Sequence, residues 1–252
     1  AAFGGNGVGI KPMTAFSYMQ NAFNHVASGD IIYFVGKITE QLVTPVQVFD
    51  VTVVGCGNRP RHADAAPLGS AYAAATWAAP ASPTSGQALC RVLQQGWKFV
   101  NILWAGSAGC ASLELVRNAA SGDDERDASH VEVVGCRFAG VNSTDSAIKF
   151  GSTSYTEIVN NAYIHDNDFQ GCATAIKEHS ASLQYRCQIS NNVFISNTND
   201  VVVGGYFLHV LNNVMSLAPT SCLKLDGGTG SNQVHGNYLP GAYTDGTLYN
   251  AG

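Results

Sequence analysis

The chain has 252 residues, of which 46% are hydrophobic and only 12% are charged, and its formal net charge is −5. This negative charge argues against a nucleic-acid partner. No apolar run reaches the roughly 18 residues of a membrane span, and no basic segment followed by an apolar stretch opens the chain as a secretory signal would. We therefore expect a protein that binds neither nucleic acid nor membrane and carries no visible signal peptide.

The first 28 residues are predicted to form an arm and a capping helix. Residues 1–10 are rich in glycine, which is typical of an extended arm or linker. Pro12 suits the first turn of a helix and Gly29 suits its end, so a helix is expected over 12–28. Apolar residues recur in it at helical spacing, namely Phe16, Met19, Phe23 and Val26. We expect this helix to cover one end of the core that follows.

A long loop is expected after strands at 30–35 and 46–54. The segment 59–87 is rich in Ala, Pro, Ser and Gly, which predicts a loop expelled from the body of the fold. Long loops of this kind are usually functional or contact a partner. The alternative is a flap that packs on the outside of its own domain through Tyr72 and Trp77.

The same loop supplies the candidates for ligand binding. Arg59, Arg61 and His62 lie at its start, and a guanidinium group suits the carboxylate of a sugar or a phosphate. Tyr72 and Trp77 would add aromatic rings for a glycan. A structural alternative is that the arginines pair with acidic residues further along the chain and pin the loop to the fold.

An acidic segment provides the candidates for catalysis. Asp123, Asp124 and Asp127 fall within five residues, and His130 follows closely. Such carboxylates can bind a divalent cation or form the acid and base of glycoside cleavage. Consecutive residues point in different directions, however, so the segment equally fits a solvated turn whose acids pair with Arg126 or with the arginines of the loop.

The thiols and the remaining polar groups indicate no metal or cofactor. The seven cysteines are odd in number and show no C-x-x-C spacing, so we expect free thiols and no zinc site. A further group contains His165, Asp166 and Asp168, with Glu178 and His179 on a later edge. Asp166 and Asp168 flank Asn167 and are expected to point outward, and histidines in outward turns are mostly inert.

One short phrase recurs along the chain. An aliphatic residue, a spacer and a small or polar residue precede an asparagine, and a variable and a large apolar residue follow it. The clearest copies contain Asn192, Asn213 and Asn237, which lie 21 and 24 residues apart. With the weaker copies, the slot holds in order Cys56, Asn101, Cys136, Asn167, Asn192, Asn213 and Asn237.

A period of this length predicts a solenoid, because one coil cannot bury its own apolar side chains and must stack on the next. Stacked strands lie about 4.8 Å apart, so an amide in the slot reaches the identical amide of the next coil and builds an asparagine ladder. A short apolar strand follows each copy from Asn101 onwards, so each coil has at least two strands. A β-sandwich with asparagine-rich turns is the alternative, but it requires no asparagine at a constant strand offset.

These repeats resemble those of right-handed parallel β-helix proteins, a group that includes pectate-lyase-like enzymes and the tailspikes of tailed bacteriophages. Four segments are similar, more narrowly, to a β-helix protein that recurs in phage genomes: GDIIYFVGKITE, VVGCGNRPRH, GWKFVNILW and GDDERDASHVEVVGCRF. The resemblance covers about residues 30–250. It implies an all-β fold in which one right-handed, single-stranded β-helix spans 29–252 behind the capping helix.

For function, the resemblance implies a structural protein of a bacteriophage virion, such as a tailspike, fibre or capsid decoration, that contacts host surface glycans. It also implies a homotrimer, made in the host cytoplasm and located in the virion beside other virion proteins. The alternatives are a lyase or glycoside hydrolase acting on acidic surface polysaccharide, and a non-catalytic glycan-binding module. Because the strand pattern is still running at Leu248, we expect the chain to continue or a partner to cover that end.

Overall fold

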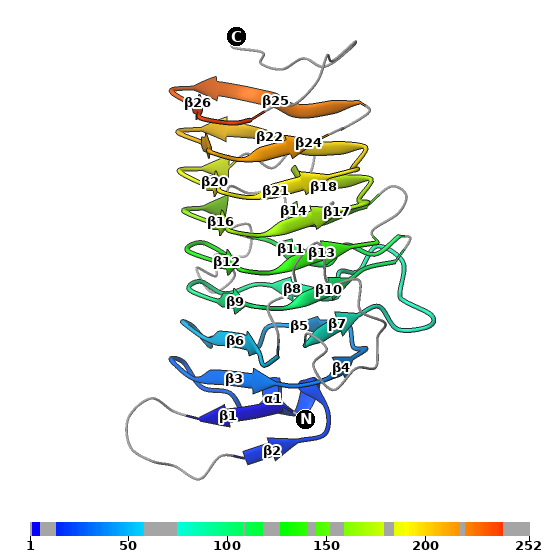
Figure 1. Cartoon of the computed structure of the whole chain (residues 1–252). Coiled ribbons are helices and arrows are strands. Elements are labelled where there is room, and N and C mark those ends of the chain that lie inside the picture. The colour runs from blue at the N-terminus through cyan, green and yellow to red at the C-terminus, as the bar shows by residue number, and fades with distance from the viewer. Residues whose placement is uncertain are drawn as a thin grey trace.

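The chain winds through three sheets, one coil stacked on the next, as a parallel β-helix (Figure 1). This computed structural model describes residues 2–5, 14–57, 75–107, 109–117, 127–140, 145–151, 159–178, 184–216 and 220–238. Equivalent strands of successive coils pair in parallel and in register. The predicted all-β parallel β-helix is confirmed, and the sandwich alternative is wrong.

We name the three sheets A, B and C. Sheet A contains β2 (Thr14–Phe16), β1 (Ala2–Gly5), β3 (Ile31–Phe34), β6 (Thr52–Gly55), β9 (Lys98–Val100), β12 (Glu132–Val134), β16 (Tyr163–His165), β20 (Gln188–Ser190), β23 (His209–Leu211) and β26 (Gln233–His235). Sheet B contains β4 (Lys37–Ile38), β7 (Thr76–Ala78), β10 (Leu103–Ala105), β13 (Arg137–Ala139), β17 (Asp168–Gln170), β21 (Val193–Ile195) and β24 (Val214–Ser216). Sheet C contains β5 (Leu42–Val43), β8 (Cys90–Val92), β11 (Leu113–Leu115), β14 (Ser146–Phe150), β18 (Thr174–Glu178), β22 (Asn199–Tyr206) and β25 (Ser221–Gly230), with β15 (Val159–Asn160) and β19 (Gln184–Tyr185) beside the end of β22.

The recurring phrase spans a two-residue turn from a strand of sheet A to a strand of sheet B. The first turn residue has a left-handed backbone, as at Asp166, where φ is 55°. Glycine, asparagine and aspartate tolerate this conformation best. They fill the position in six coils, at Asn101, Gly135, Asp166, Asn191, Asn212 and Gly236.

The second turn residue forms the asparagine ladder, which is confirmed for Asn167, Asn192, Asn213 and Asn237. The Nδ2 group of each of the first three donates to Oδ1 of the next, at 3.0, 3.1 and 2.9 Å. Each Oδ1 also accepts a backbone N–H of the preceding coil, which at the N-terminal end of the ladder is that of Cys136, at 2.9 Å. The ladder thereby ties consecutive coils together through buried amides.

Asn101 is not a member of this ladder, which corrects the sequence prediction. The register Leu103 to Arg137 places Ile102, not Asn101, level with Cys136. Asn101 occupies the left-handed position instead, and its Nδ2 donates to the Gly55 carbonyl at 2.8 Å. The pattern misled because Asn is favoured at both turn positions, for backbone conformation at the first and for amide pairing at the second.

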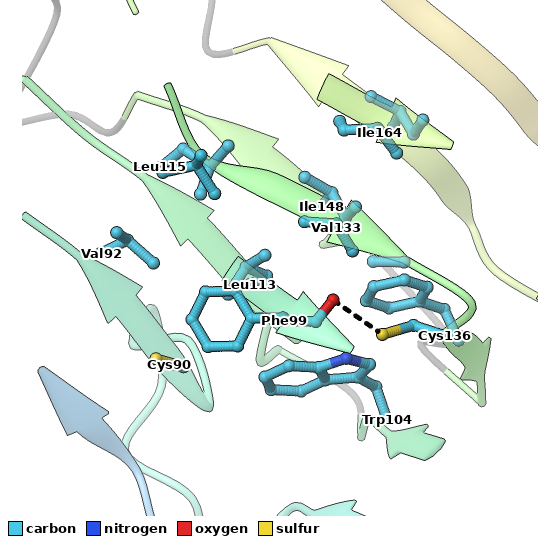
Figure 2. Packing of buried hydrophobic residues seen from close by; sticks show 14 of the residues in the cluster. Cys90, Val92, Phe99, Trp104, Leu113, Leu115, Val133, Cys136, Ile148 and Ile164 are labelled. Atoms are coloured by element: carbon cyan, nitrogen blue, oxygen red, sulfur yellow. Dashed lines mark hydrogen bonds between the residues drawn. The ribbon is translucent and has the colours of Figure 1, made fainter. Parts of the chain in front are cut away.

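The interior is built from columns of identical or similar side chains. In sheet B, Trp104, Phe138, Phe169 and Phe194 lie in register and are all 0% exposed. Their ring centroids are 5.9, 4.8 and 4.9 Å apart in nearly parallel planes. Figure 2 shows Phe99 of sheet A reaching the same interior, where its carbonyl accepts from the Cys136 thiol at 3.6 Å. Stacked rings of this kind bury large areas in a fixed geometry.

The N-terminal segment departs from the predicted arm and long helix. Residues 2–5 and 14–16 form strands, and both pair antiparallel at the edge of sheet A. The helix α1 is shorter than expected and covers only Met19–His25. Its Phe23 is buried and lies 5.3 Å from the Trp97 ring. Strand pairing explains the difference, because it covers an open sheet edge that a helix over 12–28 would leave unpaired (Figure 1).

The predicted loop 59–87 also extends too far towards the C-terminus, because it includes strand β7. Strand β7 pairs with β4 and β10, so its residues belong to the wall of sheet B. The Gly86 N–H donates to the Gly109 carbonyl at 3.1 Å, which holds the following segment to the next coil. Residues 59–74 of the predicted loop lie outside the described residues.

Candidate functional site

Several of the predicted site residues fall outside the part of the chain that the structure describes. They are the loop residues Arg59, Arg61, His62 and Tyr72 and the acidic residues Asp123 and Asp124. Their proposed roles, and the salt bridge between the two segments, stay predictions.

Asp127 and His130 both have structural partners. The Asp127 carboxylate lies 3.6 Å from the Arg117 guanidinium and accepts the Ser129 N–H at 2.9 Å. Asp127 and Arg117 form a bridge at the base of the acidic segment. His130 is exposed in a left-handed turn, and its Nε2 lies 3.2 Å from the Asn161 side-chain amide. These contacts close turns, and they do not direct an acid and a base at a common point.

Trp77 is not available to stack on a glycan, which corrects the predicted role. It is 0% exposed in β7, and its ring stacks on that of Trp104 at 4.8 Å. Its indole Nε1 donates to the Glu40 carbonyl at 2.8 Å. Trp77 therefore begins the interior aromatic column, and the alanine-rich neighbouring sequence concealed this strand.

The outer face of sheet A carries a network of charged side chains that we call the sheet A network, made of Lys98, Glu132, His165 and Asp166. The strands β9, β12 and β16 lie side by side, and Lys98 is level with Glu132, whereas His165 is level with Val134, two residues further along β12. Glu132 Oε1 lies 2.8 Å from Lys98 Nζ and 3.0 Å from His165 Nε2. The other ring nitrogen, Nδ1, lies 2.6 Å from Asp166 Oδ2. Tyr163 stacks on the same imidazole, with ring centroids 3.8 Å apart.

Neighbouring cations set the charge of Glu132. Burial on its own would raise the pKa of Glu132, but hydrogen bonds from Lys98 and His165 and the charges of these groups outweigh it and hold the pKa below its usual value. The carboxylate is therefore ionised near neutral pH. Both imidazole nitrogens of His165 lie within hydrogen-bond distance of carboxylate oxygens, Nδ1 of Asp166 and Nε2 of Glu132.

In this geometry the side chains of the sheet A network contact one another. A general base needs a lone pair directed at the proton it abstracts, and the two imidazole nitrogens are already engaged. Asp166 is exposed, as predicted, and Asp168 is half-buried, whereas Glu178 is buried and accepts the Gly204 N–H. Lys98 and Glu132 escaped the sequence analysis because they are 34 residues apart, and only the strand register brings them into contact.

The described residues contain neither a candidate metal cluster nor a candidate membrane-spanning helix. Within the described ranges, no group of three or more His, Cys, Asp or Glu residues is placed to hold a metal ion. In the same ranges, no helix is both long and apolar enough to cross a bilayer. All seven cysteines are free thiols, as predicted.

No family model and no curated protein matches the chain. Among solved structures, one described as a new PL6 alginate lyase in complex with trisaccharide aligns with a TM-score of 0.42 and 11% identity, over 88% of this chain and 56% of that one. ORF18 of Geobacillus virus E2 aligns with a TM-score of 0.29 and 12% identity, over 87% of this chain and 56% of that one. The chain thus spans about half the length of each of these proteins.

Proposed function

We propose that this chain is the β-helical body of a structural protein of a bacteriophage particle, such as a tailspike, fibre or capsid decoration. The strongest support is that the asparagines of the interior and the charged side chains of the sheet A network bind one another. Asn167, Asn192 and Asn213 bind one another inside the coils. On the outer face, Glu132 contacts both Lys98 and His165 and ties three coils together. Both sets stabilise a rigid rod, and neither presents a reactive group to a substrate.

We also propose that the protein assembles as a homotrimer in the virion with other virion proteins. Exposed apolar side chains support this assembly, because their burial between copies would be favourable. Four of them belong to the first coils: Tyr33, Val35, Val43 and Val46, which are 39%, 45%, 46% and 48% exposed. An interface between copies along these coils would cover them.

A polysaccharide lyase acting on acidic surface polysaccharide is the second candidate. One feature of the outer face of sheet A favours it. Lys98 and Tyr163 lie in one outward column on either side of Glu132. A cation can neutralise a sugar carboxylate, and a phenol can transfer a proton during elimination. A lyase would require that the substrate break the contacts of Lys98 with Glu132 and of His165 with Glu132 and Asp166.

A turnover assay separates the two functions. The purified protein would be incubated with alginate, polygalacturonate and hyaluronan, and unsaturated uronate would be followed by its ultraviolet absorbance. Our proposal predicts no product above a boiled-protein control, and no difference between wild type and Glu132→Gln or Tyr163→Phe. Product that is formed by wild type and lost in Tyr163→Phe, with unchanged circular dichroism, would replace the structural function by the lyase.

A further inference from the structure

The corner at which the chain enters sheet A has a left-handed residue in each coil. From the N-terminus these residues are Gly29, Asp50, Gly96, His130, Asn161, Arg186, Phe207 and Ser231. Glycine, aspartate and asparagine are the residues that adopt this backbone readily. Arg186 and Phe207, with φ of 55° and 56°, are bulky residues on successive coils for which this conformation is unfavourable. Strain kept at two neighbouring positions points to a function for their side chains.

These two residues form an exposed cluster with the tyrosines that precede them, and we call Tyr185, Arg186, Tyr206 and Phe207 the aromatic corner. Tyr185 and Tyr206 are in parallel register. The Phe207 ring meets the Tyr185 ring edge-on, with centroids 5.4 Å apart and an interplanar angle of 77°. The Arg186 guanidinium lies over the Tyr185 ring, 5.1 Å from its centroid. Tyr206 and Phe207 are 38% and 42% exposed, so the rings are not packed into the core.

The flanking coils place polar or small residues beside the aromatic corner. On one side Asn160 is in register with Tyr185, and its neighbour Asn161 is half-buried in the turn. On the other side the coil has Gly230 level with Tyr206 and an exposed Ser231 after it. The rings therefore lie between amides on one side and small residues on the other.

Arg186 gives the aromatic corner a preference for negatively charged ligands. Among the described residues, no carboxylate lies within ion-pair distance of its guanidinium, although the whole chain has a net charge of −5. A guanidinium matches a carboxylate with two parallel hydrogen bonds. Aromatic faces offer a flat apolar surface that accepts the C–H side of a sugar ring, and amides and hydroxyls satisfy its hydroxyl groups.

We propose that the aromatic corner binds an acidic saccharide, with a sugar ring on Tyr206 and Phe207 and its carboxylate on Arg186. This inference rests on the proposed function, because it names the ligand class and the surface through which such a particle protein would contact a glycan. It replaces Trp77, which is buried, as the aromatic contact.

Substitution by glycine tests the proposal sharply, because glycine relieves the backbone strain while removing the ring. The probes are hexamers of galacturonate, mannuronate and glucuronate, with a dextran oligosaccharide as the neutral control, and affinity is measured by isothermal titration calorimetry. Wild type should bind at least one acidic hexamer and bind dextran at least tenfold more weakly. Phe207→Gly should weaken that binding at least tenfold, while its thermal unfolding midpoint stays equal to or above that of wild type. Arg186→Gln should weaken acidic binding to the level of dextran.

Ser196→Gly is the matched control, since Ser196 is an exposed left-handed residue at a different corner, with φ of 54°. It should leave affinity unchanged. The proposal is overturned if wild type binds none of the acidic hexamers, if it binds dextran equally well, or if Phe207→Gly keeps full affinity. A Phe207→Gly variant that loses stability but not affinity would assign the ring a packing role. The binding result is independent of the turnover assay and of the mass of the assembly. The saccharide site can therefore be refuted without refuting the proposed function.

Discussion

Replacing Asn192 by alanine should destabilise the fold far more than the loss of one side chain suggests. Its Oδ1 accepts the Asn167 backbone N–H and the Asn167 side-chain amide, both at 3.0 Å. Its Nδ2 donates to the Ile164 carbonyl at 2.9 Å and to Asn213 Oδ1 at 3.1 Å. Alanine leaves two buried N–H groups of Asn167 without a partner and removes one of the hydrogen bonds to the Ile164 carbonyl. At about 1–3 kcal/mol each, partly relieved by a water that enters the gap, the expected loss is about 3–5 kcal/mol.

Urea unfolding followed by circular dichroism measures this loss, and Asn237→Ala is its control. Asn237 makes equivalent bonds to Asn213 and to the Val210 carbonyl but is partly exposed, so water can replace the amide. We expect Asn237→Ala to cost about 1 kcal/mol, as for an ordinary hydrogen bond. If the two variants lose the same free energy, or if Asn192→Ala loses less than about 1 kcal/mol, the ladder does not stabilise the coils in the way argued above.

Three further outcomes follow from buried groups. Burial raises the pKa of Asp200 to about 7, against hydrogen bonds from Asn197 and Cys222 that lower it. Because the folded pKa lies above the unfolded value, stability should fall as pH rises from about 4 to about 7, by at most about 4 kcal/mol, and Asp200→Asn should remove this dependence of the unfolding midpoint on pH. Iodoacetamide should modify the half-exposed Cys56 in the native protein and the other six thiols only after unfolding, as counted by mass spectrometry, and rapid native labelling of a second thiol would contradict the described burial. Phe169→Ala removes a ring between two stacked neighbours 4.8 and 4.9 Å away and should cost about 3–5 kcal/mol in urea unfolding, whereas a loss under about 1 kcal/mol would show that the column contributes little.

Periodicity made the coil predictable from the sequence. The spacing of Asn192, Asn213 and Asn237 reflects a ladder in which each amide must meet the next, so the chemistry of the position constrains its residue type. The apolar strands after each copy were found for the same reason, since Leu113, Leu115, Leu223 and Leu225 are buried in the interior. Asn101 shows the limit of this reasoning, because two adjacent turn positions favour asparagine for different physical causes.

The contacts between polar side chains on the surface were harder to predict, because they depend on the register between neighbouring strands. Lys98 and His165 meet Glu132 only after the coils are stacked, and the number of residues between coils varies with the loops. The aromatic corner was missed for a related reason. Nothing in the order of Tyr185 and Phe207 along the chain indicates that their rings touch, and left-handed conformation is not expected at a phenylalanine. Trp77 was misplaced because its strand has only three residues and follows a low-complexity segment.

The mass of the purified protein in solution, measured by multi-angle light scattering, tests the central claim most directly. A virion rod that buries the exposed apolar side chains of its first coils should form a stable assembly of three chains of 26.5 kDa each, unchanged on dilution. A monomer of 26.5 kDa at all concentrations would contradict the proposed particle protein. The acidic polysaccharides would then become the first substrates to test.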